Sequence, residues 1–150
     1  MLQKIYKLRT RNMRYADTLF DAAYEYVMLL DAIANRFDEE CEYGSYAIRE
    51  CEELRKLWVE CKAYKALDSL TKEDAVLYPT TLGIAARLIL DKIRAFEEAS
   101  VEYFSAADGI DEGYLNKKRD AQIDAYYELR DAMIANKEEL YVKTYSVPTR

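Results

Sequence analysis

The chain has 150 residues, enough for one domain with a single hydrophobic core and too few for a second, catalytic domain. Hydrophobic residues make up 51% and charged residues 33%, while only 4 glycines and 2 prolines can serve the turns of a many-stranded sheet. The absence of histidine excludes histidine-containing catalytic triads, histidine-ligated metals and a histidine pH switch. The composition therefore predicts an all-α protein without a metal or a cofactor.

The three cysteines, Cys41, Cys51 and Cys61, belong to no CxxC pair and to no other metal or redox motif. On one helix a step of ten residues rotates the side chain by about 280°, so neighbouring cysteines would not share a face. Small buried thiols in a reducing compartment are the simplest interpretation. We expect a cytoplasmic protein, because the sequence lacks a signal-peptide core and the roughly 18 apolar residues that a membrane span needs.

The first predicted helix covers residues 12–43. Its apolar positions alternate in steps of three and four residues, which is the pattern of a heptad seam. The seam consists of Met13, Ala16, Phe20, Ala23, Val27, Leu30, Ala34, Phe37 and Cys41. Gly44 is predicted to end the helix, since a residue without a Cβ readily takes the left-handed C-cap conformation. Alternatively, the acidic residues 38–40 open a new helix, because they oppose the dipole at a helix C-terminus.

The second predicted helix covers residues 46–70, with Ser45 as its N-cap. Its apolar stripe again advances by three or four residues, as expected for one face of a helix. The stripe consists of Ile48, Cys51, Leu54, Leu57, Trp58, Cys61, Tyr64 and Leu67. Residues 71–74 resemble a capping box and predict one or two further helical turns before Pro79 interrupts the pattern.

A third helix is predicted after Pro79, and a fourth over residues 114–141. The third seam is Leu82, Ala86, Ile89, Ile93, Phe96, Ser100, Tyr103 and Ala107, and the fourth is Gln122, Tyr126, Leu129, Met133, Asn136 and Leu140. The polar members of the fourth seam leave two interpretations. Gln122 and Asn136 either fix register from within the seam, or the buried stripe is rotated toward Ile123 and Ala125.

Residues 141–150 alternate in polarity before a proline and predict an extended tail. Four helices with short connections predict an antiparallel up-down four-helix bundle, in which successive helices are neighbours. We expect one helical-bundle domain with a basic arm at residues 1–12, the bundle at residues 13–140 and the tail at residues 141–150.

The net charge of −6 is unevenly distributed along the chain. Residues 1–14 and 141–150 hold seven of the 22 basic residues and no acidic ones. Residues 15–140 therefore contain 15 basic residues and all 28 acidic residues, and this part of the chain is strongly negative. Residues 38–53 carry seven acidic residues against one basic, and residues 97–112 carry six against none. In an up-down bundle these two zones lie at the same end, opposite the basic arms. The alternative is that both zones are ordinary solvated helix surface.

No constellation in the sequence supports catalysis. The paired carboxylates lie beside the apolar seams and lack the Glu-x-x-His motif of ferritin-like metal sites. The cysteines lie among acidic residues, which raise a thiol pKa, and there is no phosphate-binding loop or nucleophile elbow. We expect a non-enzymatic protein with no catalytic, cofactor-binding or metal-binding residues and no small-molecule substrate.

The 14 tyrosines are the other unusual feature of the composition. Those on the seams are predicted to lie in the core. Those off the seams, Tyr6, Tyr15, Tyr46, Tyr114 and Tyr145, would expose amphipathic rings of the kind that is enriched at protein interfaces. The alternative is that they are partly buried rim residues of a small bundle.

We favour a non-enzymatic structural or assembly protein that docks onto neighbouring subunits through its terminal arms, as in a virus particle or a connector ring. Its partners would be proteins, including copies of itself in a ring or filament, because the acidic body disfavours direct nucleic-acid binding. The alternative is a small acidic binding module, or a nucleic-acid mimic, that presents its carboxylate-rich end to a basic partner. The candidate protein-binding residues are Lys4, Tyr6, Lys7, Arg9, Arg11, Glu39, Glu40, Glu52, Glu53, Tyr145 and Val147.

Overall fold

The computed structural model describes residues 11–40, 44–74, 81–107, 109 and 111–146. The elements are α2 (Leu19–Glu40), α3 (Gly44–Glu60), α4 (Lys62–Ser69), the π-helical turn η1 (Leu70–Asp74), α6 (Thr81–Ala106), α7 (Glu112–Ala135), α8 (Lys137–Leu140) and the short 3-10 helix η2 (Thr144–Ser146). Residues 11–14 are also helical. The predicted all-α class is confirmed for the described residues, in which no strand forms. None of the described helices has the length and apolar character needed to cross a membrane.

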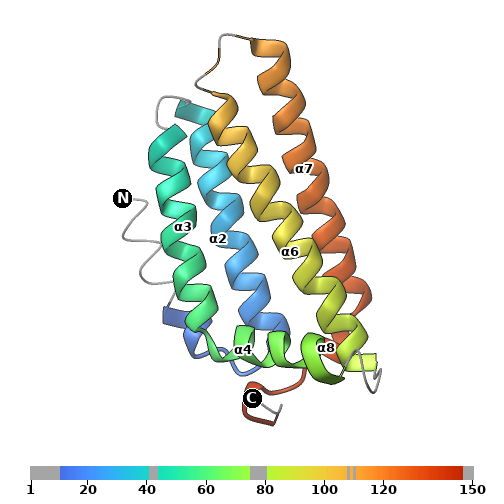
Figure 1. Cartoon of the computed structure of the whole chain (residues 1–150). Helices are drawn as coiled ribbons and strands as arrows, with labels where there is room; N and C mark the ends of the chain where they lie inside the picture. The colour runs from blue at the N-terminus through green and yellow to red at the C-terminus, as the bar shows by residue number, and fades with distance from the viewer. Residues whose placement is uncertain (1–10, 41–43, 75–80, 108, 110, 147–150) are drawn as a thin grey trace.

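The long helices α2, α3, α6 and α7 lie alongside one another, and helices that follow each other in the chain run in opposite directions (Figure 1). The C-terminal end of α2, the N-terminal end of α3 and the facing ends of α6 and α7 lie at one end of the molecule (Figure 1). The helical residues 11–14 and η2 lie at the other end. The chain order therefore brings the two acidic zones to the same end.

Helix α2 is the centre of the core, with 10 of its 22 residues buried. Helices α3, α4, α6 and α8 all pack against it. The predicted seam accounts for one buried row, and a second row consists of Leu19, Ala22, Tyr26, Leu29 and Ile33. Two adjacent buried rows give a helix a wide apolar face, and α2 can therefore pack against several helices at once.

The predicted helix over residues 12–43 is interrupted near its start: residues 11–14 are helical, residues 15–18 are not, and α2 begins at Leu19. Residues 17–19 instead pair with the end of the chain: the amide of Leu19 donates to the carbonyl of Val142 at 3.2 Å, and the amide of Thr144 donates to the carbonyl of Asp17 at 2.8 Å. The Thr18 hydroxyl then accepts a hydrogen bond from the amide of Asp21 at 3.1 Å. This N-cap satisfies a free amide of the first turn and starts α2.

The predicted tail over residues 141–150 is extended for only a few residues. Thr18 and Lys143 form an isolated antiparallel bridge, after which the chain turns into η2. Thr144 is buried, so this part of the tail is folded onto its own chain. Residues 147–150 and the arm at residues 1–10 lie outside the described residues.

The predicted helix over residues 46–70 is interrupted at Cys61, which separates α3 from α4. Cys61 has extended backbone angles, φ −66° and ψ 138°, and its thiol donates to the carbonyl of Met13 at 3.3 Å. The bend turns α4 across the end of the molecule, where Ala63, Ala66 and Leu67 are buried (Figure 1). Gly44 is the first residue of α3 rather than the cap of the preceding helix, and α2 ends at Glu40.

The predicted third helix matches α6, and its seam is buried or half-buried throughout the described residues. The fourth helix is divided at Asn136, whose side-chain amide donates to the carbonyl of Ala132 at 2.8 Å. Gln122 lies in the buried seam, and its amide donates to the hydroxyl of Ser100 at 3.4 Å. The interpretation with polar residues inside the seam is therefore correct, and the stripe is not rotated toward Ile123.

Candidate functional site

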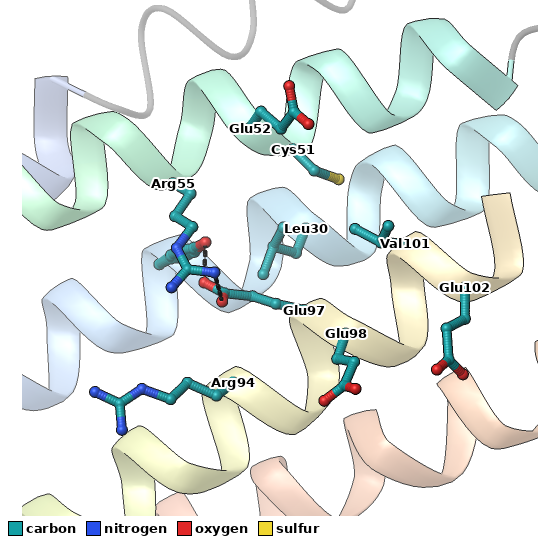
Figure 2. A pocket seen from close by; sticks show the side chains of 10 residues that line it. Leu30, Cys51, Glu52, Arg55, Arg94, Glu97, Glu98, Val101 and Glu102 are labelled. Atoms are coloured by element: carbon teal, nitrogen blue, oxygen red, sulfur yellow. Dashed lines mark hydrogen bonds and ion pairs between the residues drawn. The ribbon is translucent and has the colours of Figure 1, made fainter. Parts of the chain in front are cut away.

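A groove of about 640 Å³ lies between α3 and α6, with α2 as its floor (Figure 2). The buried Tyr26 and Leu30 on α2 and the half-buried Val101 on α6 lie at its floor, and charged side chains line both walls. On α6 the lining positions follow the three- and four-residue spacing of one helix face: Arg94, Glu97, Glu98, Val101 and Glu102. On α3 the corresponding positions are Cys51, Glu52 and Arg55.

Glu97 is the best-connected residue of this groove. Its carboxylate accepts a hydrogen bond from the hydroxyl of Tyr26, and its second oxygen lies 3.2 Å from the guanidinium of Arg55. The Glu97 side chain is only 12% exposed, whereas that of Arg55 is 57% exposed. The three residues belong to α2, α6 and α3, so this cluster joins three helices at the groove (Figure 2).

Burial determines the protonation of these groups. Burial raises the pKa of Glu97 above its ordinary value of 4.5, although the Tyr26 hydrogen bond and the charge of Arg55 act in the opposite direction. Burial, followed by the negative charge of Glu97, raises the pKa of Tyr26. The Tyr26 hydroxyl therefore stays protonated and remains a hydrogen-bond donor to Glu97.

Cys51 lies in the same groove and is buried. Burial, assisted by the nearby carboxylates of Glu97, Glu50 and Glu52, raises its pKa to about 12. Burial also raises the pKa of the buried thiol of Cys61. A thiol with a raised pKa is a poor nucleophile at neutral pH, so neither residue is suited to thiolate chemistry. Both are free, buried cysteines, as the sequence predicted, and Cys41 lies outside the described residues.

The groove has a different charge at each end. Arg55 and Arg94 lie toward the end near the helical residues 11–14, whereas Glu98 and Glu102 lie toward the end where α6 finishes (Figure 2). Glu102 pairs with Lys118 at 3.2 Å. Glu52 and Glu98 are exposed and make no ion pair within the part of the chain that the structure describes. The groove thus combines an apolar floor with two carboxylates that are available to an external cation.

The structure brings few of the predicted site residues together. Glu52 lines the groove, while Glu53 is exposed on α3 outside it. Glu39 and Glu40 are exposed at the end of α2, where Arg36 lies 3.6 Å from one and 2.7 Å from the other. Arg11 is exposed on the helical residues 11–14, and the backbone of Tyr145 belongs to η2. Four of the predicted residues, Lys4, Tyr6, Lys7 and Arg9, and also Val147, lie outside the described residues.

The acidic end is partly neutralised by cations at the start of α7. The guanidinium of Arg119 lies 3.3 Å from the carboxylate of Asp38, which also accepts a hydrogen bond from Tyr103 at 3.0 Å. With the Lys118–Glu102 pair, two cations of α7 are turned toward this end. Asp38, Glu39, Glu40 and Glu102 are therefore each paired with a cation, whereas Glu52 and Glu98 have no ion-pair partner among the described residues.

Three off-seam tyrosines, Tyr15, Tyr46 and Tyr114, are exposed as predicted. Tyr24, Tyr127 and Tyr141 are also exposed, which the seam pattern did not indicate. Tyr141 stacks on Phe20 with ring centroids 4.9 Å apart, so part of this aromatic surface is used within the chain. Tyr6 and the side chain of Tyr145 are outside the described part of the molecule.

No protein-family model, no curated protein and no solved structure matches this chain. The assignment of a function therefore depends on the groove itself. Among the described residues, no three histidine, cysteine, aspartate or glutamate side chains gather closely enough to hold a metal ion. The Cys51 thiol is protonated, and the Tyr26–Glu97–Arg55 cluster places a hydrogen bond and an ion pair at the groove.

Four residues of the groove were not predicted as site residues: Tyr26, Arg55, Arg94 and Glu97. Tyr26 belongs to the second apolar row of α2, which could have been found by searching for two stripes instead of one. Glu97 was noticed only as part of an acidic run. The sequence does not indicate that the side chains of Glu97 and Arg55 meet, because the two residues are far apart in the chain and only tertiary packing brings their helices together.

Proposed function

We propose that this chain is a non-enzymatic assembly protein that binds a cationic, partly apolar segment of a neighbouring protein in the α3–α6 groove. The four-helix bundle formed by α2, α3 with α4, α6, and α7 with α8 is its rigid body, and the basic arm at residues 1–12 is the contact it offers to a neighbour. The proposed setting is the reducing cytoplasm, or a particle assembled there, which agrees with the free thiols of Cys51 and Cys61.

The observation that carries this proposal is the composition of the groove. Its floor is apolar, and its walls hold four carboxylates against two guanidinium groups. Two of these carboxylates, Glu52 and Glu98, have no ion-pair partner in the described part of the chain. An acidic groove over apolar side chains favours a peptide in which lysine or arginine alternates with apolar residues, because both components of that peptide find partners.

The folding of the tail changes which arm is available. Residues 142–144 already form backbone hydrogen bonds with residues 17–19. The backbone of residues 142–144 is therefore not free to pair with the edge of a sheet in a neighbouring protein. The proposal therefore assigns docking to the basic arm and to the groove, rather than to both arms as the sequence suggested.

A direct test uses a fluorescent peptide of alternating lysine and leucine that is unrelated to this chain, and measures its anisotropy with the purified protein. We expect salt-sensitive binding, which falls between about 50 mM and about 500 mM salt because screening shortens electrostatic reach. Reversal of the groove charge in the variant Glu52→Lys/Glu98→Lys should weaken binding about tenfold or more.

The matched control is Asp120→Lys/Asp124→Lys, which makes the same change in net charge at exposed positions of α7 outside the groove. This control should bind the peptide nearly as well as the original chain. Equal weakening by both double variants would mean that only net charge matters, and the groove would then not be the site.

A second candidate function is an acidic module that blocks an unrelated basic protein, including one that binds nucleic acid. The exposed Glu52, Glu53 and Glu98 favour this alternative, since they present negative charge without internal partners. Light scattering with size exclusion separates the two. Salt-sensitive self-association supports an assembly protein, whereas a monomer that still binds the cationic peptide supports the blocking module.

A further inference from the structure

The charge gradient along the groove restricts the direction from which a cationic segment can enter. Figure 2 shows Arg55 and Arg94 toward one end and Glu98 and Glu102 toward the other. Glu102 lies about one turn before the end of α6, which finishes at Ala106. Since Glu102 is paired with Lys118, a cationic segment that enters from this end meets the unpaired carboxylate of Glu98, whereas one that enters from the opposite end first meets the guanidinium groups of Arg55 and Arg94.

The chain contains a segment of the required chemistry at residues 4–11, which read Lys-Ile-Tyr-Lys-Leu-Arg-Thr-Arg. Four of its eight residues are basic and three are apolar, and none is acidic. Its cations match Glu52 and Glu98, and its apolar side chains match Val101, the half-buried apolar residue of the groove, since Leu30 is already buried. The segment therefore complements the groove in both charge and hydrophobicity.

The attachment point of this segment lies at the wrong end of its own groove. Arg14 pairs with Glu60 at 3.3 Å, and Met13 accepts a hydrogen bond from the thiol of Cys61, so residues 11–14 are held at the C-terminal end of α3. Arg55 and Arg94 lie toward this end (Figure 2). To reach Glu98 in its own groove, the segment would have to pass Arg55 and Arg94, whose guanidinium groups are already paired with Glu97 and with Asp68 and Asp91. A segment from another molecule can instead enter beside Glu98, which has no ion-pair partner among the described residues.

We propose that residues 4–11 of a second copy of this chain occupy the groove, entering from the end that carries Glu98 and Glu102. This inference rests on the proposed function, since it identifies the cationic neighbour as another copy. The two contact surfaces differ, so the interface is heterologous and each copy offers one segment and one groove. Successive copies join head to tail and form a ring if the rotation closes, or a filament if it does not.

Two charge-reversed variants test this arrangement. The arm variant is Lys4→Glu/Lys7→Glu/Arg9→Glu, and the groove variant is Glu52→Lys/Glu98→Lys. Sedimentation velocity over about a hundredfold range of protein concentration should show that the original chain associates more as its concentration rises. Each variant alone should associate about tenfold or more weakly, because every contact then joins like charges.

Mixing the two variants provides the decisive measurement. The unchanged arm of the groove variant can enter the unchanged groove of the arm variant, and the reversed arm can enter the reversed groove. We expect the mixture to recover association at a ratio of one to one. The Asp120→Lys/Asp124→Lys control should associate like the original chain, and circular dichroism of every variant checks that the helices are retained.

Several outcomes would overturn the inference. An original chain that is monomeric at every concentration, or a mixture that fails to recover association, excludes docking between copies. If deletion of residues 1–10 strengthens binding of the lysine–leucine peptide to a monomeric protein, the segment covers its own groove instead. In either case the groove can still bind the unrelated peptide, and the chain is then a peptide-binding acidic module rather than an assembly protein. Loss of both self-association and peptide binding removes the inference and peptide recognition by the groove together.

Discussion

The hydroxyl of Tyr26 on α2 donates a hydrogen bond to the carboxylate of Glu97 on α6, and Arg55 on α3 lies 3.2 Å from the second oxygen of the same carboxylate. One partly buried charge is therefore satisfied from two other helices. The hydrogen bond from Tyr26 should contribute more to stability than the ion pair with Arg55, because Tyr26 is buried and Arg55 is largely exposed to solvent.

Replacement of Tyr26 by phenylalanine keeps the buried ring but removes the hydroxyl that donates to Glu97. We expect the free energy of unfolding to fall by about 1–2 kcal/mol, because a partly buried carboxylate loses a hydrogen bond. Urea unfolding followed by the fluorescence of Trp58, the single tryptophan of the chain, measures this change. Tyr24→Phe, at an exposed position of the same helix, should change stability by less than about 0.5 kcal/mol.

Glu97 should also make stability depend on pH. Its pKa is raised above 4.5 in the folded protein, mainly by burial, so the folded state holds the proton more tightly than the unfolded chain does. Stability therefore falls as the pH rises from about 4.5 through the raised pKa, and the loss is complete above it. The unfolding free energy of the original chain minus that of Glu97→Gln should decrease over this interval. A difference that stays constant or increases with pH would contradict the raised pKa.

Cys51 should be unreactive while the protein is folded. A pKa of about 12 lowers the thiolate fraction at pH 8 about a thousandfold relative to a thiol with the ordinary value of 9.0. The measurement is the rate of reaction with a disulfide reagent in the variant Cys41→Ser/Cys61→Ser, where Cys51 is the single thiol. Reaction should become fast when urea unfolds the protein. Comparable rates in the folded and the unfolded state would show that the thiol is neither buried nor shifted.

The N-cap at Thr18 should contribute measurably to the stability of α2. Thr18→Ala removes the hydroxyl that accepts from the amide of Asp21 at 3.1 Å, and we expect a loss of about 1 kcal/mol in the free energy of unfolding. Thr18→Ser keeps a hydroxyl at this position and should restore most of that loss. If alanine and serine are equally destabilising, the effect arises from the lost methyl group rather than from the cap.

The helical periodicity could be followed from the sequence wherever a helix is uninterrupted. The seam of α6 was predicted almost residue by residue, because three- and four-residue spacing is a local property of the chain. The breaks at Thr18 and Cys61 could not be predicted in this way. Thr18 leaves the helical pattern because residues 17–19 pair with residues 142–144, and Cys61 bends the chain where its thiol meets Met13.

The candidate site also combines features that can be predicted from the sequence with features that depend on tertiary contacts. The concentration of carboxylates on α3 and α6 is visible in the sequence, and so is the basic composition of residues 4–11. The availability of Glu52 and Glu98 is not, because it depends on which carboxylates find cations across helices. Asp38 and Glu102 are paired with α7, which removes them from the surface charge that the sequence analysis had assigned to the acidic end.

The sequence by itself determined the helical class, the apolar face of each helix and the segregation of charge along the chain. These properties depend on residue type and on spacing within one turn or two, and they hold whatever the helices pack against. The tertiary structure alone decided where the long helices are interrupted, and that Tyr26, Arg55 and Glu97 meet at one groove. Such contacts join residues far apart in the chain, and their formation depends on the packing of whole helices rather than on any local pattern.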